Sequence, residues 1–157
     1  LKTNPMKKTI FKLSFILIAF LSFTACSSAD STYAPTGTLE GVWNTGKTYG
    51  TGTGSGLNLT FEGDSEGTVN FKSDGTYDSN LIGGYVTVTI PALNQNQTTP
   101  IEPIAESGNY TYNAATDDLV LDGETSKVVL LNANNMKIKT LVDQDGVIAE
   151  IYTEYNR

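Results

Sequence analysis

The sequence predicts an all-β protein, an antiparallel up-and-down barrel of about eight to ten strands, with a β-sandwich as the alternative. From Leu39 onward the apolar residues alternate with period two, and the stretches are rich in Thr, Val, Tyr and Ile. Runs of Gly, Asn and Asp separate the stretches at the close spacing of hairpins. The expected strands are 39–48, 57–63, 66–72, 76–81, 84–90, 107–113, 118–122, 126–132, 135–142 and 146–155.

Residues 1–25 precede the barrel pattern and predict a signal peptide. Lysines at 7, 8 and 12 are followed by 13 uncharged residues, Leu13 to Ala25. A membrane-spanning helix needs roughly 20 apolar residues, so this run favours an export signal. Residues 1–5 precede Met6, the expected initiator, and are interpreted as a start-site artefact.

The segment Phe23-Thr24-Ala25-Cys26 resembles the lipobox of bacterial lipoproteins. The resemblance implies that Cys26 becomes the mature N-terminus and carries a diacylglycerol thioether and an N-acyl chain, which together anchor a protein stably. Ser27 differs from the Asp that retains such proteins at the inner membrane, which favours the outer membrane. The alternative is a cysteine that merely follows a signal peptide. Residues 26–38 are expected to form a flexible tether before a barrel domain at 39–157.

Composition argues against several function classes. One cysteine and no histidine exclude internal disulfides, Cys/His zinc sites and catalysis that depends on an imidazole base. Residues 26–157 carry six basic and 17 acidic side chains, a net charge of about −11, which disfavours binding to nucleic acid. No metal and no cofactor are expected.

Turn residues indicate where the hairpins lie. Ser73-Asp74-Gly75 predicts a three-residue loop with Gly75 at positive φ, which pairs Phe71 with Tyr77 and turns both inward. Further hairpin loops are expected at 113–118, 132–135 and 143–146. The sequence predicts one long irregular stretch at 94–103 and a glycine-rich loop or bulged connection at 49–56.

Residues 41–48 match the phosphate-loop pattern G-x-x-x-x-G-K-[ST]. That loop needs a following helix whose amides bind phosphate. The glycine-rich run 49–56 predicts no helix there, so no nucleotide site is expected.

Three short motifs resemble the lipocalin-like domain of bacterial lipoproteins. They are Gly41-Val42-Trp43, the hairpin Phe71 to Tyr77, and the strand Ser107-Gly108-Asn109-Tyr110, in that order. The resemblance implies a barrel of about eight strands, possibly with a ligand cavity. It also implies that Trp43 plugs the closed end beneath a cation, which Arg157 could supply.

Alternating aromatic and apolar residues are the candidates for lining a ligand cavity. Barrels of about eight strands either fill with side chains or hold one small ligand. The candidate lining residues are Phe71, Tyr77, Tyr110, Tyr112, Met136 and Ile138.

The acidic residues read as turn and surface positions, so neither a calcium loop at Asp143 and Asp145 nor a glycosidase pair is expected. The leading hypothesis is a lipid-anchored envelope protein that binds a small apolar or amphipathic molecule, and not an enzyme. The alternative is an adhesin-like or inhibitor-like surface protein that contacts a protein or glycan through its loops.

Overall fold

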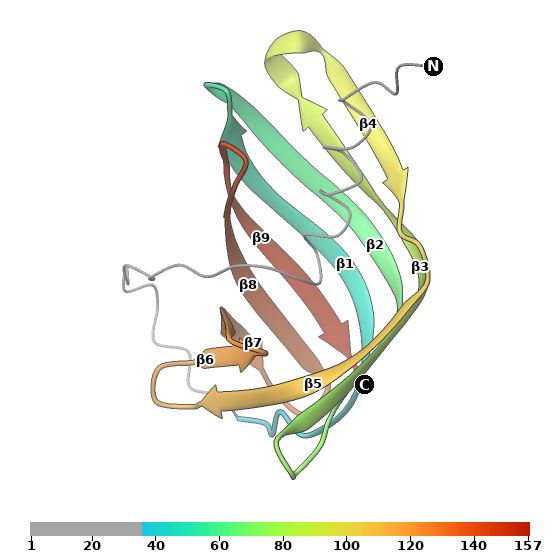
Figure 1. Cartoon of the computed structure of the whole chain (residues 1–157), viewed down its shortest axis with the longest axis vertical. Coiled ribbons are helices and arrows are strands. Elements are labelled where there is room, and N and C mark those ends of the chain that lie inside the picture. Colours follow the sequence, from blue (N-terminus) through green and yellow to red (C-terminus); the bar gives the residue numbers. More distant parts are fainter. Residues whose placement is uncertain (1–35) are drawn as a thin grey trace.

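The computed structural model describes residues 36–157, an all-β fold in which nine antiparallel strands form one continuous sheet (Figure 1). A single turn of 3-10 helix, η1, covers Pro91–Leu93. The strands are β1 Gly41–Gly54, β2 Leu57–Phe71, β3 Thr76–Ile90, β4 Gln95–Pro100, β5 Ile104–Asn113, β6 Asp118–Leu121, β7 Glu124–Leu131, β8 Asn135–Gln144 and β9 Val147–Asn156. The predicted signal segment, Cys26 and most of the predicted tether lie outside the described residues.

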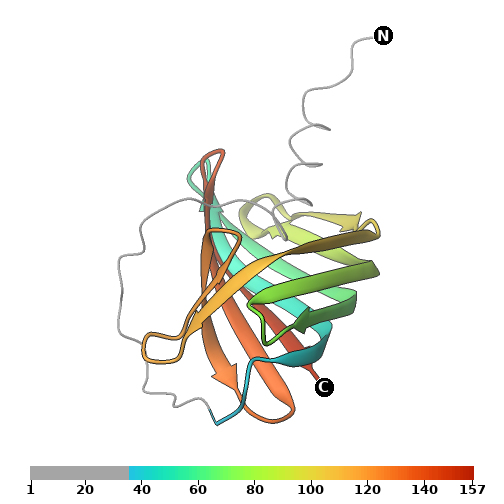
Figure 2. The same ribbon diagram turned by 60° about the horizontal axis from the view of Figure 1, so that its bottom comes forward.

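Eight of the strands close into a barrel, which confirms the predicted fold (Figure 2). The sheet order is β2-β1-β9-β8-β7-β6-β5-β3, and β2 also pairs with β3 to complete the circle. Neighbours in the barrel follow one another in sequence, the up-and-down pattern, apart from the pairing of β1 with β9 and that of β3 with β5, between which β4 lies in the sequence. The ninth strand, β4, is additional and pairs with β3.

β4 and β5 share one position in the sheet, interrupted at residues 101–103. Ile90 pairs with Gln95 and Leu81 with Ile104, so the register along β3 is the same for both strands. The predicted irregular stretch at 94–103 is therefore wrong, because most of it is β4. Polar residues with no alternation gave no strand signal there. Pro100, which lacks an N–H, fits because β4 is an edge strand.

The upper and lower halves of the barrel differ. We call the end with the β1–β2 and β8–β9 turns the upper end, and the end with loop 73–75 and the C-terminus the lower end (Figure 1). β5, β6 and β7 complete the wall only in the lower half. Among residues 36–157, β7 pairs with β8 no further up than Lys139, and β4 pairs only with β3. The upper half is thus a curved six-stranded sheet with edges at β4 and β8.

The hairpin between β2 and β3 has the predicted register. Phe71 pairs with Tyr77, Gly75 has φ +81°, and the Lys72 amide donates to the Thr76 carbonyl oxygen at 2.9 Å. Phe71 and Tyr77 are 2% and 7% exposed, so both face the interior as expected.

The glycine-rich run at 49–56 is not a loop, because β1 continues through it to Gly54. Gly50 and Gly52 lie opposite the buried Phe61 and Leu59, so these glycines face inward. A Cβ on Gly50 would collide with the Glu150 carbonyl oxygen, and one on Gly52 would lie 2.6 Å from the Ile148 carbonyl oxygen. Glycine therefore permits close approach of β1 to β9 at these two positions.

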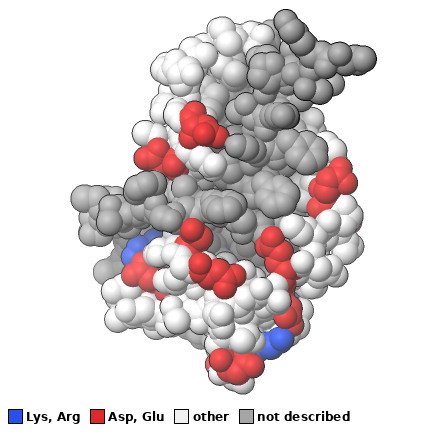
Figure 3. Space-filling model, in the orientation of Figure 1, with Lys and Arg blue, Asp and Glu red and all other residues white. Residues whose placement is uncertain are grey.

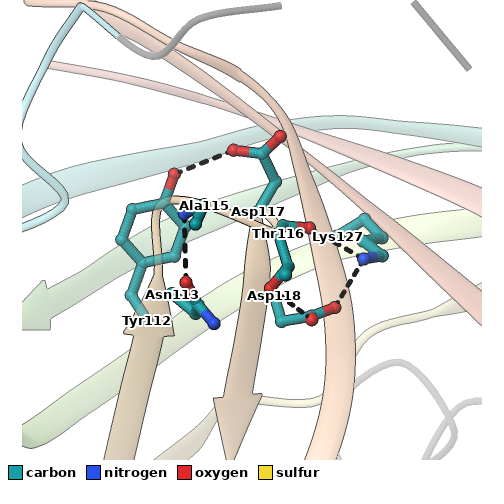
Figure 4. A network of polar contacts seen from close by, with 7 residues as sticks. All are labelled: Tyr112, Asn113, Ala115, Thr116, Asp117, Asp118 and Lys127. Atoms are coloured by element: carbon teal, nitrogen blue, oxygen red, sulfur yellow. Dashed lines mark hydrogen bonds and ion pairs between the residues drawn. The ribbon is translucent and has the colours of Figure 1, made fainter. Parts of the chain in front are cut away.

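The turn between β5 and β6 is held by a network of polar contacts (Figure 4). Lys127 forms an ion pair with Asp118 at 2.7 Å and donates to the Thr116 carbonyl oxygen at 2.8 Å. The Asn113 side chain accepts from the Ala115 amide at 3.0 Å. These contacts connect the turn to β7 and so fix the short wall that closes the lower half.

Candidate functional site

All six predicted lining residues lie in the lower half of the barrel. Phe71, Tyr77, Met136 and Ile138 are buried there, and Tyr110 and Tyr112 are partly buried against them. The Tyr110 ring meets the Phe71 ring edge-on, with the centroids 5.0 Å apart. These side chains pack against one another in what we call the lower cluster, and ligand contact by them stays a prediction. The cluster consists of Leu39, Trp43, Val69, Phe71, Tyr77, Leu119, Val128, Leu131, Met136 and Ile138.

Trp43 lies in the lower cluster, near the lower end of the barrel. Its side chain is fully buried, and its indole N–H donates to the Leu39 carbonyl oxygen at 2.7 Å. The Arg157 guanidinium lies over the indole, 4.0 Å from the ring centroid, as the resemblance to lipocalins implies. Arg157 is fixed in turn by the Thr38 carbonyl oxygen at 3.2 Å and by the Glu40 carbonyl oxygen. We call Trp43 and Arg157 together the plug, and whether they seal the barrel stays a prediction.

A second apolar cluster lines the upper half. It consists of Leu59, Phe61, Val142, Ala149 and Ile151. Val88, Ile90 and Val147 pack against it and are only partly buried. The same residues border the inward glycines of β1, which carry no side chain to fill the interior. The upper cluster therefore lies where the wall is incomplete.

Small hydroxyl residues separate the two clusters. In β2, Ser65 lies between Phe61 above and Val69 below, and in β8 Thr140 lies between Val142 and Ile138 on the same inward face. Inward-facing hydroxyl residues also occur on the other strands, although not in one register: Ser79 pairs with Val69 and Thr153 with Ile138, whereas Thr140 pairs with Ile151. We call this set the polar belt: Thr48, Ser65, Ser79, Ser126, Thr140 and Thr153.

The polar belt is only partly satisfied by its own hydrogen bonds. The Ser126 and Thr140 hydroxyls form a hydrogen bond of 2.9 Å with each other. The Ser65 hydroxyl donates to the Gly46 carbonyl oxygen at 3.2 Å. Thr48 reaches Thr153 at 3.4 Å, a long and weak contact. Each hydroxyl can donate once and accept twice, so the belt keeps capacity for further hydrogen bonds.

Three carboxylates border the belt on the short wall. Glu106 faces inward from β5 opposite Ser79, and Glu124 faces inward from β7 opposite Leu121. Asp122, in the turn between β6 and β7, accepts from the Tyr77 hydroxyl at 2.9 Å and from the Asn109 amide at 2.8 Å. Glu106 and Asp122 lie close enough to interact, although Asp122 is exposed, and we call this pair the acidic corner.

Gly108 makes room for the acidic corner. A Cβ at this position would collide with the carboxylate of Asp122. The glycine of the Ser107-Gly108-Asn109-Tyr110 motif is therefore explained by the side chain that crosses it. Sequence reasoning missed Asp122, because a side chain that leaves a turn follows no strand alternation.

Burial alters the acid–base properties of this corner. Burial and the nearby Asp122 carboxylate raise the pKa of the Glu106 carboxyl above its usual range. Burial, and then the hydrogen bond to Asp122, raises the pKa of Tyr77 to about 12, so its hydroxyl stays a donor at neutral pH. The Glu124 Oε2 atom and the Gln144 Oε1 atom are buried and accept no hydrogen bond.

The lysines lie on the outside of the barrel. Lys72 pairs with Asp78 at 2.6 Å, Lys137 with Glu154 at 2.9 Å and Lys139 with Glu150 at 3.5 Å. Inward-facing residues of β8 alternate with these lysines, so the cations point away from the interior. Apart from its apolar clusters, the inner face of the described barrel wall thus carries hydroxyls and carboxylates, and Arg157 lies over Trp43 at its lower end.

Within residues 36–157, no group of three or more Cys, Asp or Glu side chains is arranged to hold a metal ion. No helix in this part of the chain is long and apolar enough to cross a membrane. The predicted lipidation residue, Cys26, lies outside the described residues. No protein-family model, curated protein or solved structure matches the chain.

Proposed function

We propose that the chain is a lipid-anchored envelope protein, at the outer membrane, whose barrel binds a small amphipathic molecule. The observation that carries the binding proposal is the order of the inner layers. A plugged apolar cluster lies at the bottom, the polar belt lies above it, and the second apolar cluster lies where the wall is incomplete. A ligand with an apolar part and a polar group would match the two upper layers.

Ligand pockets are mostly apolar with a few convergent polar groups. The upper cluster supplies the apolar surface, with partly buried Val88 and Ile90 available for contact. The polar belt supplies hydroxyls at the inner end of that surface. The alternative, contacts of an adhesin-like protein through loops at 49–56 and 92–106, loses its support because both segments are largely strand.

Filling the space beside the upper cluster should weaken ligand binding. Ala149 is buried opposite Gly52 and Val142, so Ala149→Trp would place an indole where the ligand's apolar part lies. We expect at least a tenfold loss of affinity for a neutral naphthylamine dye, measured by fluorescence titration of residues 26–157 carrying Cys26→Ser. A tenfold loss corresponds to about 1.4 kcal/mol of binding free energy.

Ile148→Trp is the matched control, because Ile148 is the adjacent residue, faces outward and is 61% exposed. Circular dichroism would verify that both variants fold. Equal affinity of the two variants, or no dye binding by the wild type, would contradict the binding proposal.

The anchor has its own test. We expect radiolabelled palmitate to be incorporated by cells that make the full chain and to be lost almost completely in Cys26→Ser. The support is the lipobox-like Phe23-Thr24-Ala25-Cys26, in which Cys26 is the sole acceptor thiol. Equal labelling of the two proteins would rule out lipidation at this residue.

A further inference from the structure

We propose that two copies of the chain associate through β4, which pairs antiparallel with β4 of the second copy and so joins the two sheets. β4 is the strand that the barrel does not need for its closure. This interaction surface is a sheet edge and not the barrel interior, so the proposal does not depend on ligand binding.

β4 presents a free edge. Within residues 36–157 it pairs only with β3, and both ribbon views place it at the margin of the sheet (Figure 1 and Figure 2). The Ile101 amide donates to the Gly84 carbonyl oxygen at 3.0 Å, which extends the ladder by one bonded pair. Bonded positions alternate along an antiparallel ladder, so the backbone groups of Asn96, Thr98 and Pro100 face away from β3. The N–H and C=O groups of Asn96 and Thr98 are therefore free to pair with another strand.

The geometry of β4 suits pairing with its own copy. A two-fold axis perpendicular to the sheet turns a strand into its own antiparallel neighbour, so both copies use the same edge. With the axis close to Thr98, the outward groups of Asn96 and Thr98 form about four backbone hydrogen bonds between the copies. Pro100 limits the paired stretch, because its nitrogen faces outward and has no hydrogen to donate. The pairing is therefore confined to the middle of β4.

This edge carries no charge. Natural proteins usually protect an exposed edge strand with lysine or other charged side chains, with proline, with a bulge or by keeping the strand short. Residues 79–101, which include the upper part of β3 and all of β4, contain no charged residue, whereas residues 26–157 contain six basic and 17 acidic ones. In Figure 3 the top of the described surface, where Figure 1 places the turn between β3 and β4, shows neither red nor blue. Apart from Pro100 and its short length, β4 has none of these protections.

The charge of the rest of the domain favours a second copy at this edge. Two domains that each carry a net charge of about −11 repel one another, so they approach most readily where carboxylates are absent. The nearest outward carboxylates on this side of the sheet, Glu62 and Asp64, are in β2. In the joined sheet the β2 strands of the two copies are five strand spacings apart, about 24 Å. That distance exceeds the Debye length of about 8 Å at physiological ionic strength, so the repulsion is largely screened.

The upper part of β8 is the other free edge of the described sheet, and charge disfavours it. β8 pairs with β7 no further up than Lys139, and above that point it carries the exposed Asp143. A second copy at this edge would bring both Asp143 residues onto adjacent strands, where like charges destabilise pairing. The uncharged edge of β4 is therefore the better surface for a second copy.

Exposed apolar side chains lie close to the β4 edge. Tyr85 in β3 is opposite Pro100, and Leu93 is in the turn between the two strands; both are among the exposed large hydrophobic residues. Their burial would add to the backbone hydrogen bonds. Because β4 has only six residues, the interface is small, and we expect a reversible dimer with a dissociation constant on the order of 10 μM.

Sedimentation equilibrium of residues 26–157 carrying Cys26→Ser tests the proposal. Between about 1 μM and about 1 mM protein, in physiological salt, we expect the average mass to rise from that of a monomer to that of a dimer. Hydrogen exchange at the same two concentrations locates the interface without any substitution. The Asn96 and Thr98 amides should exchange freely in the dilute sample and at least tenfold more slowly in the concentrated one.

Thr98→Lys should raise the dissociation constant at least tenfold, because it places two like charges beside the two-fold axis. Thr60→Lys is the matched control. It adds the same charge at an exposed, outward position of β2, away from the edge, and should change the dissociation constant less than twofold. Circular dichroism would verify that both variants keep the barrel, which closes without β4.

A monomer at every concentration would overturn the inference. So would a dimer that Thr98→Lys and Thr60→Lys weaken equally, since net charge and not the edge would then control association. A dimer in which the Asn96 and Thr98 amides exchange as fast as in the monomer would show that the copies meet at another surface, and would also overturn it. None of these results bears on the proposed ligand binding.

Discussion

Trp43→Ala is expected to lower the free energy of unfolding by about 3–5 kcal/mol, the usual cost of removing a large buried aromatic side chain. Trp43 is fully buried in the lower cluster, its indole N–H is bonded to the Leu39 carbonyl oxygen, and Arg157 covers its ring. The substitution would therefore create a cavity and leave two partners without their contact. Because the whole domain is expected to be stable by only about 5–15 kcal/mol, much of its stability would be lost.

Urea denaturation followed by circular dichroism measures this effect. Val42→Ala is the matched control, since Val42 is the preceding residue and is 53% exposed; its cost should stay within about 0.5 kcal/mol. Trp43→Phe should fall between the two, because it keeps most of the packing and loses the bond to Leu39. Similar costs for Trp43→Ala and Val42→Ala would show that the plug does not stabilise the barrel.

Gly50→Ala is expected to cost at least about 2–3 kcal/mol, although it adds a single methyl group. The added Cβ would collide with the Glu150 carbonyl oxygen and lie 2.9 Å from the Ile151 Cα, both of which are backbone atoms. Backbone atoms cannot move aside by a rotamer change. The pairing of β1 with β9 would have to shift instead.

Gly83→Ala is the matched control for this change. Gly83 lies in β3, and a Cβ there would meet nothing within 4 Å. Its effect should be within about 0.5 kcal/mol in the same urea denaturation. If the two alanine variants unfold at the same urea concentration, close approach of β1 and β9 is not what requires glycine at residue 50.

Features with local causes could be predicted from the sequence. Ser73-Asp74-Gly75 fixes its own loop type, so the pairing of Phe71 with Tyr77 followed from three residues. The barrel followed from strand spacing, and the stacking of Arg157 on Trp43 followed from the resemblance to lipocalins. In each case the neighbours in the chain carry most of the information.

Features that depend on distant partners could not be predicted. Glycine disfavours strands on average, but at Gly50 the deciding contact is the backbone of β9, about a hundred residues away in sequence. The side chain of Asp122 leaves a turn, so its direction is set by Tyr77 and Gly108. The polar belt had a usable signal: β2 is one uninterrupted strand, so counting by twos from Phe71 places Ser65 inside.

The bond between the Thr36 amide and the Leu131 carbonyl oxygen, at 3.0 Å, has a consequence for orientation. It holds Thr36 at the lower end of the barrel, near Arg157. If Cys26 is acylated as proposed, the ten residues from there to Thr36 span at most about 35 Å. The bilayer would then lie nearer the lower end of the barrel than the upper end. The barrel would take up its ligand at the upper end, from the aqueous side.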